Sequence, residues 1–210
     1  MSEATPQDLL MQAVHAHETA AIDAALAQGA NFADEGVEPL YWAASDNRAD
    51  IVRHLLSRGA TIAAEWRTNS RDEPNMCHGD TALHAAAARG DVEVLRMLLG
   101  ADGKKFLEKF GMQAGWRLTA LGVAASAGHR DACRVLLEAG ADANANDTSA
   151  VGETALSEAV QKGHVEVVDL LLAAGADPRI PGWMGCSALD RAAQSSEEVR
   201  ARLRAWRAAR

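Results

Sequence analysis

The sequence predicts an all-α solenoid of about six helix–turn–helix repeats, in which the first and last repeats act as caps. Two observations support this fold class. The stretch from Gly79 to Leu99 has the pattern of one polar turn and two short helices, and variants of that pattern recur along the chain. Neither helix of the unit is long enough to be stable alone in water. Each unit therefore needs a neighbour of the same shape to cover its apolar face.

The two helices of this unit have recognisable ends. Thr81 is the expected N-cap, because its hydroxyl can accept a free backbone N–H of the first turn. Small alanine side chains follow, and Gly90 ends the first helix, because glycine readily adopts the positive φ that terminates helices. In the second helix Val94, Leu95 and Leu98 form one apolar stripe.

Two other segments copy this unit closely, one opening at 118–121 and one at 152–156. Weaker copies surround Leu40 and Leu189, and a degenerate first copy surrounds Leu10. The unit resembles the ankyrin repeat, which has about 33 residues and a T-P-L-H-x-A signature. The resemblance covers nearly the whole chain. It implies a concave binding surface, lined by the first helices and by hairpin-like finger loops.

The length variation between repeats lies in the connections, which correspond to the fingers. The expected organisation is a polar tail at 1–6 and one domain at 7–210, with repeats at 7–30, 36–60, 79–103, 117–141, 152–176 and 185–210, and insertions at 61–78 and 104–116. The first insertion is rich in charge and turn formers and contains Trp66, so it is either a recognition loop or a structural one. The second is expected to form an extra helical turn.

Composition limits the function classes. The net charge of −8 argues against nucleic-acid binding, which usually needs a basic face. Three widely spaced cysteines indicate no disulfide framework, and a reducing cytoplasm fits them. The first residues are polar and acidic, unlike a signal peptide, and no apolar run reaches membrane length. We therefore expect a cytoplasmic monomer that does not contact a membrane.

One cluster resembles an enzyme or metal site. Cys77, His78, Asp80 and His84 lie close together in the sequence, and cysteine and histidine are common metal ligands and catalytic partners. His84, however, stands at the histidine of the repeat signature, and the resemblance implies a structural role for it. No phosphate loop, nucleophile elbow or catalytic carboxylate pair is recognisable. We expect no enzymatic activity, cofactor or metal, and keep a metal or enzymatic role of Cys77, His78 and His84 as an alternative.

Positions whose chemistry differs from copy to copy indicate the binding surface. Each first helix contains one leucine that recurs in every copy, such as Leu83, which we call the key leucine. The key leucine and the valines and leucines of the second helix stay constant, as core positions do. The position two residues after the key leucine, the position before the glycine and the fingers vary. Tryptophans occupy several of these variable positions, and tryptophan is enriched at binding hot spots. The predicted partner-binding residues are Trp42, Asp46, Trp66, His78, Arg89, Trp116, Glu158, Lys162, Trp183 and Met184.

The predicted function is therefore non-enzymatic binding of a partner protein, whose surface could be basic. Trp42, Trp116 and Trp183 are expected to be separate anchors spaced along one face, because adjacent repeats lie roughly 10 Å apart. An inhibitor or immunity protein of bacterial type, which neutralises a basic toxin or enzyme, is the alternative. The arginines at 200–210 are expected to form a solvated face of the last cap, and binding of something anionic is the other interpretation.

Overall fold

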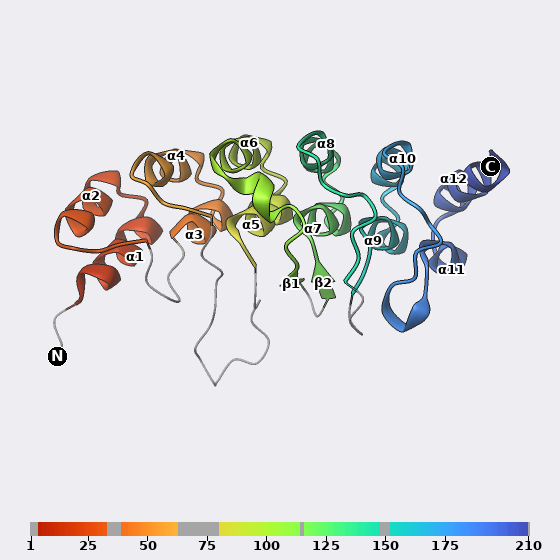
Figure 1. Ribbon diagram of the computed structural model, residues 1–210, viewed down its shortest axis with the longest axis horizontal. Coiled ribbons are helices and arrows are strands. Elements are labelled where there is room, and N and C mark those ends of the chain that lie inside the picture. The colour runs from red at the N-terminus through yellow and green to blue at the C-terminus, as the bar shows by residue number, and fades with distance from the viewer. Residues whose placement is uncertain (1–3, 33–38, 63–79, 114–115, 148–151, 210) are drawn as a thin grey trace.

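Short helices lie in two rows along the length of the molecule (Figure 1). The computed structural model describes residues 4–32, 39–62, 80–113, 116–147 and 152–209. The first row contains α1 (Pro6–Ala16), α3 (Pro39–Ser45), α5 (Ala82–Arg89), α7 (Ala120–Ser126), α9 (Ala155–Lys162) and α11 (Ala188–Arg191). The second row contains α2 (Thr19–Ala27), α4 (Ala49–Ser57), α6 (Val92–Ala101), α8 (Arg130–Glu138), α10 (Val165–Ala173) and α12 (Glu197–Ala208). The predicted helical solenoid is confirmed.

Hydroxyl side chains cap the N-termini of the first-row helices α1, α5, α7, α9 and α11. Thr119 accepts a hydrogen bond from the backbone N–H of Gly122, and Thr154 accepts one from Ser157. Thr81 is the N-cap of α5, as expected, and the helix ends at Gly90, where φ is 71°. These caps satisfy backbone groups that a short helix leaves unpaired at its ends.

The core is one continuous band between the rows. Along the first row α3 packs on α5, α5 on α7, α7 on α9 and α9 on α11; along the second row α4 packs on α6, α6 on α8, α8 on α10 and α10 on α12. The key leucines Leu83, Leu121 and Leu156 are at most 1% exposed. Each repeat therefore shares its apolar core with the repeats beside it, as in other solenoids.

Histidines join consecutive repeats. The ring of His129 lies 3.1 Å, through Nε2, from the carbonyl oxygen of Ala88, and the ring of His164 lies at the same distance from that of Ser126. The rings need glycine beside them: a Cβ on Gly128, where φ is 78°, would lie 2.8 Å from the His164 ring. Glycine here serves both the left-handed turn and the close approach of the histidine.

His84 makes a similar connection from inside the core. Its Nδ1 accepts a hydrogen bond from the backbone N–H of Thr81 at 3.1 Å. Nε2 therefore carries the proton and lies 3.1 Å from the carbonyl oxygen of Lys109 and 3.2 Å from that of Leu118. Burial lowers the pKa of His84 to about 4, so the ring is neutral at pH 7. The structural role implied by the resemblance matches these contacts.

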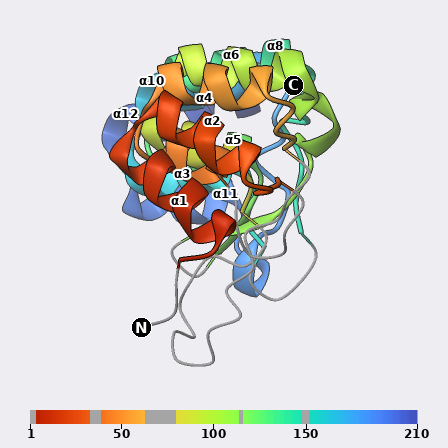
Figure 2. The same cartoon turned by 90° about the vertical axis from the view of Figure 1, so that its left-hand side faces the viewer.

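The finger between α6 and α7 is a short hairpin. Strand β1 (Gly111–Gln113) pairs antiparallel with β2 (Trp116–Leu118), with Gly111 opposite Leu118. The expected helical turn before it is the 3₁₀ helix η1 (Gly103–Phe106), and Leu107 is buried beside it. The two-stranded sheet is a small addition to the predicted all-α architecture. The strands β1 and β2, and the loop between α10 and α11, lie on the side of the first row (Figure 1 and Figure 2).

Three further findings concern the expected N-terminal tail, the insertion at 61–78 and the expected absence of a membrane-spanning helix. Helix α1 begins at Pro6 behind the N-cap Thr5, so the first helix begins inside the expected tail. The insertion at 61–78 falls almost wholly outside the described residues. Among the helices described, none combines the length and the apolar character needed to cross a lipid bilayer.

Ion pairs cross from one second-row helix to the next. Asp23 on α2 lies 2.9 Å from His54, which is in α4, and 2.6 Å from Arg58, the residue that follows α4. Arg53 and Glu93 are 2.6 Å apart between α4 and α6, and Arg202 and Asp169 are 2.8 Å apart between α10 and α12. Such exposed pairs add little stability each. They show that neighbouring repeats here match opposite charges along the second row.

Leu156 tests the assigned register. Leu156→Ala is expected to lower the free energy of unfolding by about 2–5 kcal/mol, because it leaves a cavity between two repeats. Leu189→Ala, at the same position of the last repeat, is the control and should cost less, because Leu189 is only partly buried. Chemical denaturation measures both. A Leu156→Ala midpoint equal to that of the wild type would contradict the register.

His84 should make stability depend on pH. Its pKa is about 4 when folded, against 6.5 for an unperturbed histidine, so the unfolded chain binds a proton that the folded chain does not. The free energy of unfolding should therefore fall as the pH drops from about 7 towards 4, with a loss of about 3 kcal/mol from this group. His84→Gln retains an acceptor for the cap. It should be less stable at pH 7 and show a flatter pH dependence in denaturation curves. Parallel curves for the two proteins would contradict this assignment.

Candidate functional site

Large exposed apolar side chains gather on the finger between α10 and α11. This finger contains the 3₁₀ turn η2 (Trp183–Gly185). Trp183 is 38% exposed and Met184 is 75% exposed, and they are the large apolar side chains that lie exposed in the described part of the chain. Among the described residues, the other large apolar side chains are buried or partly buried, so this finger displays two exposed ones side by side.

Trp183 also contacts an indole from another finger. The rings of Trp116, on β2, and Trp183 meet edge to face with their centroids 5.0 Å apart. The expectation that these tryptophans are separate anchors was wrong. The fingers extend beyond the helices, so long side chains from two of them can reach each other although their repeats are not adjacent. Aromatic pairs of this geometry are favourable beyond the area that they bury.

The backbone of Met184 has a left-handed conformation. Its φ is 55° and its ψ is 22°, and the following Gly185 has φ 74°. This region costs an L-residue with a side chain roughly 1–2 kcal/mol, which glycine avoids. Met184 bears this cost at an exposed position, where its side chain gains little from burial. We call the surface formed by Trp116, Trp183 and Met184 the finger surface.

A buried carboxylate supports the finger surface from below. Glu153 is 2% exposed, forms an ion pair with Arg191, and accepts the backbone N–H of Trp183 at 3.3 Å. Arg191 also donates to the side chain of Gln161 at 2.8 Å. Burial raises the pKa of Glu153, and the Arg191 guanidinium opposes that shift. The network fixes the backbone of Trp183 and so the position of its ring.

Two more contacts hold the neighbouring fingers in place. Arg117, next to Trp116, forms an ion pair with Asp147. Asn146 donates from Nδ2 to the carbonyl oxygen of Pro181 at 2.7 Å, two residues before Trp183. Side chains and backbone groups of three fingers are thereby tied together. The finger surface is a preorganised platform.

The predicted charged residues of α9 differ in exposure. Lys162 is exposed, as expected for a residue that contacts a partner. Glu158 is only 2% exposed, and its Oε2 accepts a hydrogen bond from the hydroxyl of Ser126 at 2.6 Å. A direct surface role for Glu158 does not fit this burial. Its carboxylate instead links α9 to α7.

The predicted residues of the N-terminal half lie apart from the finger surface. Trp42 on α3 is half-buried, with its ring 5.2 Å from that of His15 and 5.6 Å from that of Tyr41. Asp46 is exposed and lies 3.5 Å from His17. Arg89 donates from Nε to the carbonyl oxygen of Ser45 at 2.7 Å. These residues connect neighbouring repeats of the first row, and their binding role stays a prediction.

The other predicted residues lie outside the described part. Trp66, Cys77 and His78 fall in the segment 63–79 that the structure does not describe. Their proposed partner, His84, has both ring nitrogens in hydrogen bonds within the core, so it is not free to bind a metal. Over the residues that are described, no group of three or more histidine, cysteine or acidic side chains is placed to hold a metal ion.

Sequence analysis missed Glu153 and Arg191. A signal for Glu153 existed within the chain, because an acidic residue stands directly before the capping threonine in two copies, as Asp80-Thr81 and Glu153-Thr154. Both acidic side chains are buried. Arg191 stands two residues after Leu189, at one of the positions that vary between copies, but no local pattern showed that it would pair with Glu153.

Comparison with known proteins bears on the repeat family. Models of ankyrin repeats match residues 65–147, 104–182 and 121–203, and a single-repeat model matches 35–64. The chain is 32% identical over 117 residues to the nuclear factor NF-kappa-B p105 subunit of Gallus gallus, covering 56% of this chain and 11% of that protein.

Two other relatives show the same partial coverage. Ankyrin repeat and SOCS box protein 3 of Homo sapiens is 36% identical over 104 residues, covering 49% of this chain and 18% of that protein. The FYVE zinc finger domain protein UPA1 of Mycosarcoma maydis is 40% identical over 65 residues, which are 30% of this chain and 4% of that protein. The chain thus spans less than a fifth of each relative. Because the repeat models extend over most of its length, the chain belongs to the ankyrin repeat family.

Proposed function

We propose that this protein binds a partner protein through the finger surface and the adjoining first-row helices. Ankyrin repeats are generally protein–protein interaction modules, and the family is generally non-enzymatic. The observation that carries the proposal is the exposure of Trp183 and Met184 on a finger braced by the Glu153–Arg191 pair. A tryptophan beside a flexible thioether is a combination that contributes strongly to binding.

The mechanism is rigid display. Trp183 is held by its ring contact with Trp116 and by the backbone hydrogen bond to Glu153. Little conformational entropy is then lost when a partner covers the surface, so more of the interaction energy appears as affinity. Met184 adds an adaptable contact next to the rigid ring.

The net charge favours a partner with a basic surface, because opposite charge accelerates encounter. Asp46 is an exposed acidic side chain on the first-row side that fits this interpretation. An inhibitor or immunity protein that neutralises a basic toxin or enzyme is a special case of the proposal, because it would use the same surface.

Met184 separates a binding role from a structural one. Met184→Gly removes the left-handed strain and the side chain together. We expect the free energy of unfolding to rise by up to about 1 kcal/mol, while partner capture becomes weaker. Denaturation and a pull-down on the same preparation measure both. Lower stability with unchanged capture would contradict a binding role for Met184.

Trp183 provides the direct test. Trp183→Ala should weaken partner binding by more than about 1 kcal/mol, because it removes the central exposed ring. The experiment is affinity capture from the host that makes the protein, with mass spectrometry of the proteins retained. Met97→Ala, at a partly buried position of α6 in the second row, is the control. A protein held equally by wild type, control and Trp183→Ala would not be a ligand of the finger surface. If every protein captured behaved in that way, the proposal would fail.

A further inference from the structure

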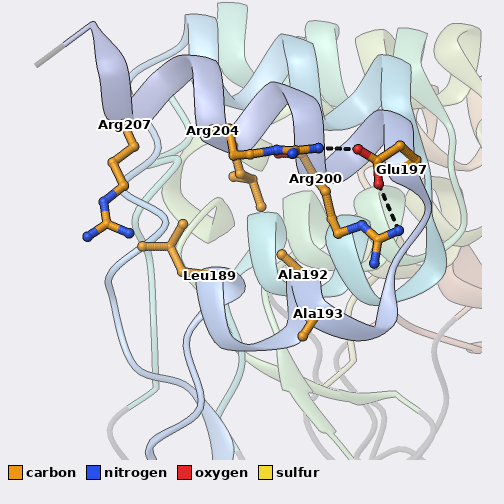
Figure 3. A pocket seen from close by; sticks show the side chains of 8 residues that line it. Leu189, Ala192, Ala193, Glu197, Arg200, Arg204 and Arg207 are labelled. Atoms are coloured by element: carbon orange, nitrogen blue, oxygen red, sulfur yellow. Dashed lines mark hydrogen bonds and ion pairs between the residues drawn. The ribbon is translucent and has the colours of Figure 1, made fainter.

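The last repeat carries an open groove with an apolar floor and a positively charged wall. It has a volume of about 540 Å³ and lies between α12 above and α11 with the 3₁₀ turn η3 (Ala192–Gln194) below (Figure 3). Leu189, Ala192, Ala193 and Leu203 provide the apolar part. The wall carries Glu197, Arg200, Arg204 and Arg207. We call this site the end groove.

The charged wall is one stripe of helix α12. Residues 197, 200, 204 and 207 follow three- and four-residue spacing, which places them on one helix face. Val199 and Leu203 are buried, and Arg202 is paired with Asp169 on α10, so that side of α12 faces the preceding repeat. The stripe therefore faces away from the preceding repeat.

The stripe has an excess of positive charge. Glu197 is the sole carboxylate among the residues that line the end groove, and it pairs with both Arg200, at 2.8 Å, and Arg204. Arg207 has no ion pair within the described chain, and Figure 3 shows it away from Glu197, near Leu189. This local excess stands in a protein whose net charge is −8. It therefore favours an acidic ligand at the end groove.

The shape of the ligand follows from the rest of the stack. The corresponding face of the preceding repeat is covered by helices, because α11 packs on α9 and α12 packs on α10. Second-row helices are also joined by acid–base pairs, including Asp169 with Arg202 and Glu93 with Arg53. A helix is thus what this type of face accommodates, and at some of these contacts oppositely charged side chains meet.

We propose that the end groove binds an amphipathic helix of a partner protein, with acidic side chains beside its apolar stripe. The apolar stripe lies on Leu189, Ala192 and Ala193, and the carboxylates meet Arg204 and Arg207. Arginine suits this role because its planar guanidinium can form two parallel hydrogen bonds with a carboxylate. The site is separate from the finger surface and does not depend on the function proposed for it.

The test uses a synthetic, fluorescently labelled helical peptide of about 18 residues, with leucines on one face and glutamates beside them. Its affinity for the full chain is measured by fluorescence anisotropy at several salt concentrations. A peptide with lysine in place of every glutamate, and a scrambled peptide of the same composition, are the ligand controls. The glutamate peptide should bind at least about tenfold more tightly than either, and added salt should weaken it.

Charge reversal of the protein locates the site. Arg204→Glu with Arg207→Glu should weaken binding of the glutamate peptide by about tenfold or more, because two attractions become repulsions. Arg96→Glu with Lys104→Glu makes the same change in net charge at exposed positions of α6 and η1 and should leave binding unchanged. Arg204→Gln with Arg207→Gln should give an intermediate loss. This milder pair keeps the test valid if the reversed protein fails to fold by circular dichroism.

Three outcomes would overturn the proposal. Equal binding of the glutamate and scrambled peptides would mean that charge alone, without a helix, is recognised. Equal losses in the groove variant and the control variant would place the peptide elsewhere. Self-association of the wild type that the groove reversal abolishes, with no binding of the peptide, would make a second copy of this chain the occupant.

Discussion

No helix pair of this protein can bury its apolar face by itself. The helices are short, and their leucines are covered because the next pair lies against them, as at Leu121 and Leu156. The fold follows from this constraint: two rows of helices, a core shared between neighbours, and fingers that leave the stack on one side. The finger surface and the end groove both lie where the stacking leaves side chains uncovered.

Buried polar groups determine how neighbouring repeats fit together. His84, His129 and His164 each bond to a backbone carbonyl of another repeat or finger. A buried polar group is costly unless it is paired, so each histidine favours the one arrangement that pairs it. The Glu153–Arg191 pair acts in the same way under Trp183. Apolar packing supplies most of the stability, and these contacts fix the register.

The repeat pattern made the fold predictable, because periodic leucines, capping threonines and helix-ending glycines report local structure directly. Trp183 and Met184 were also identifiable, since they stand at variable finger positions. The sequence did not predict how their side chains are arranged. The contact between Trp116 and Trp183 depends on how two fingers extend beyond the helices, which no local pattern encodes. The burial of Glu158 depends on its hydrogen bond to Ser126, a residue more than thirty positions away. Long-range pairing of this kind is set by the stack and not by the segment that contains the residue.

Confinement of helix contacts to neighbouring repeats has a consequence for how the chain folds. Contacts that are close in sequence need little loop closure, so the rate of folding should be high for a chain of this length. Folding can begin at any well-matched pair of repeats and extend in both directions. The central helices α7 and α9 have neighbours on both sides, whereas α1 and α12 end the described stack. Amide protons should therefore exchange slowly in the middle and faster toward the two ends, so that opening of the native state proceeds inward from the ends.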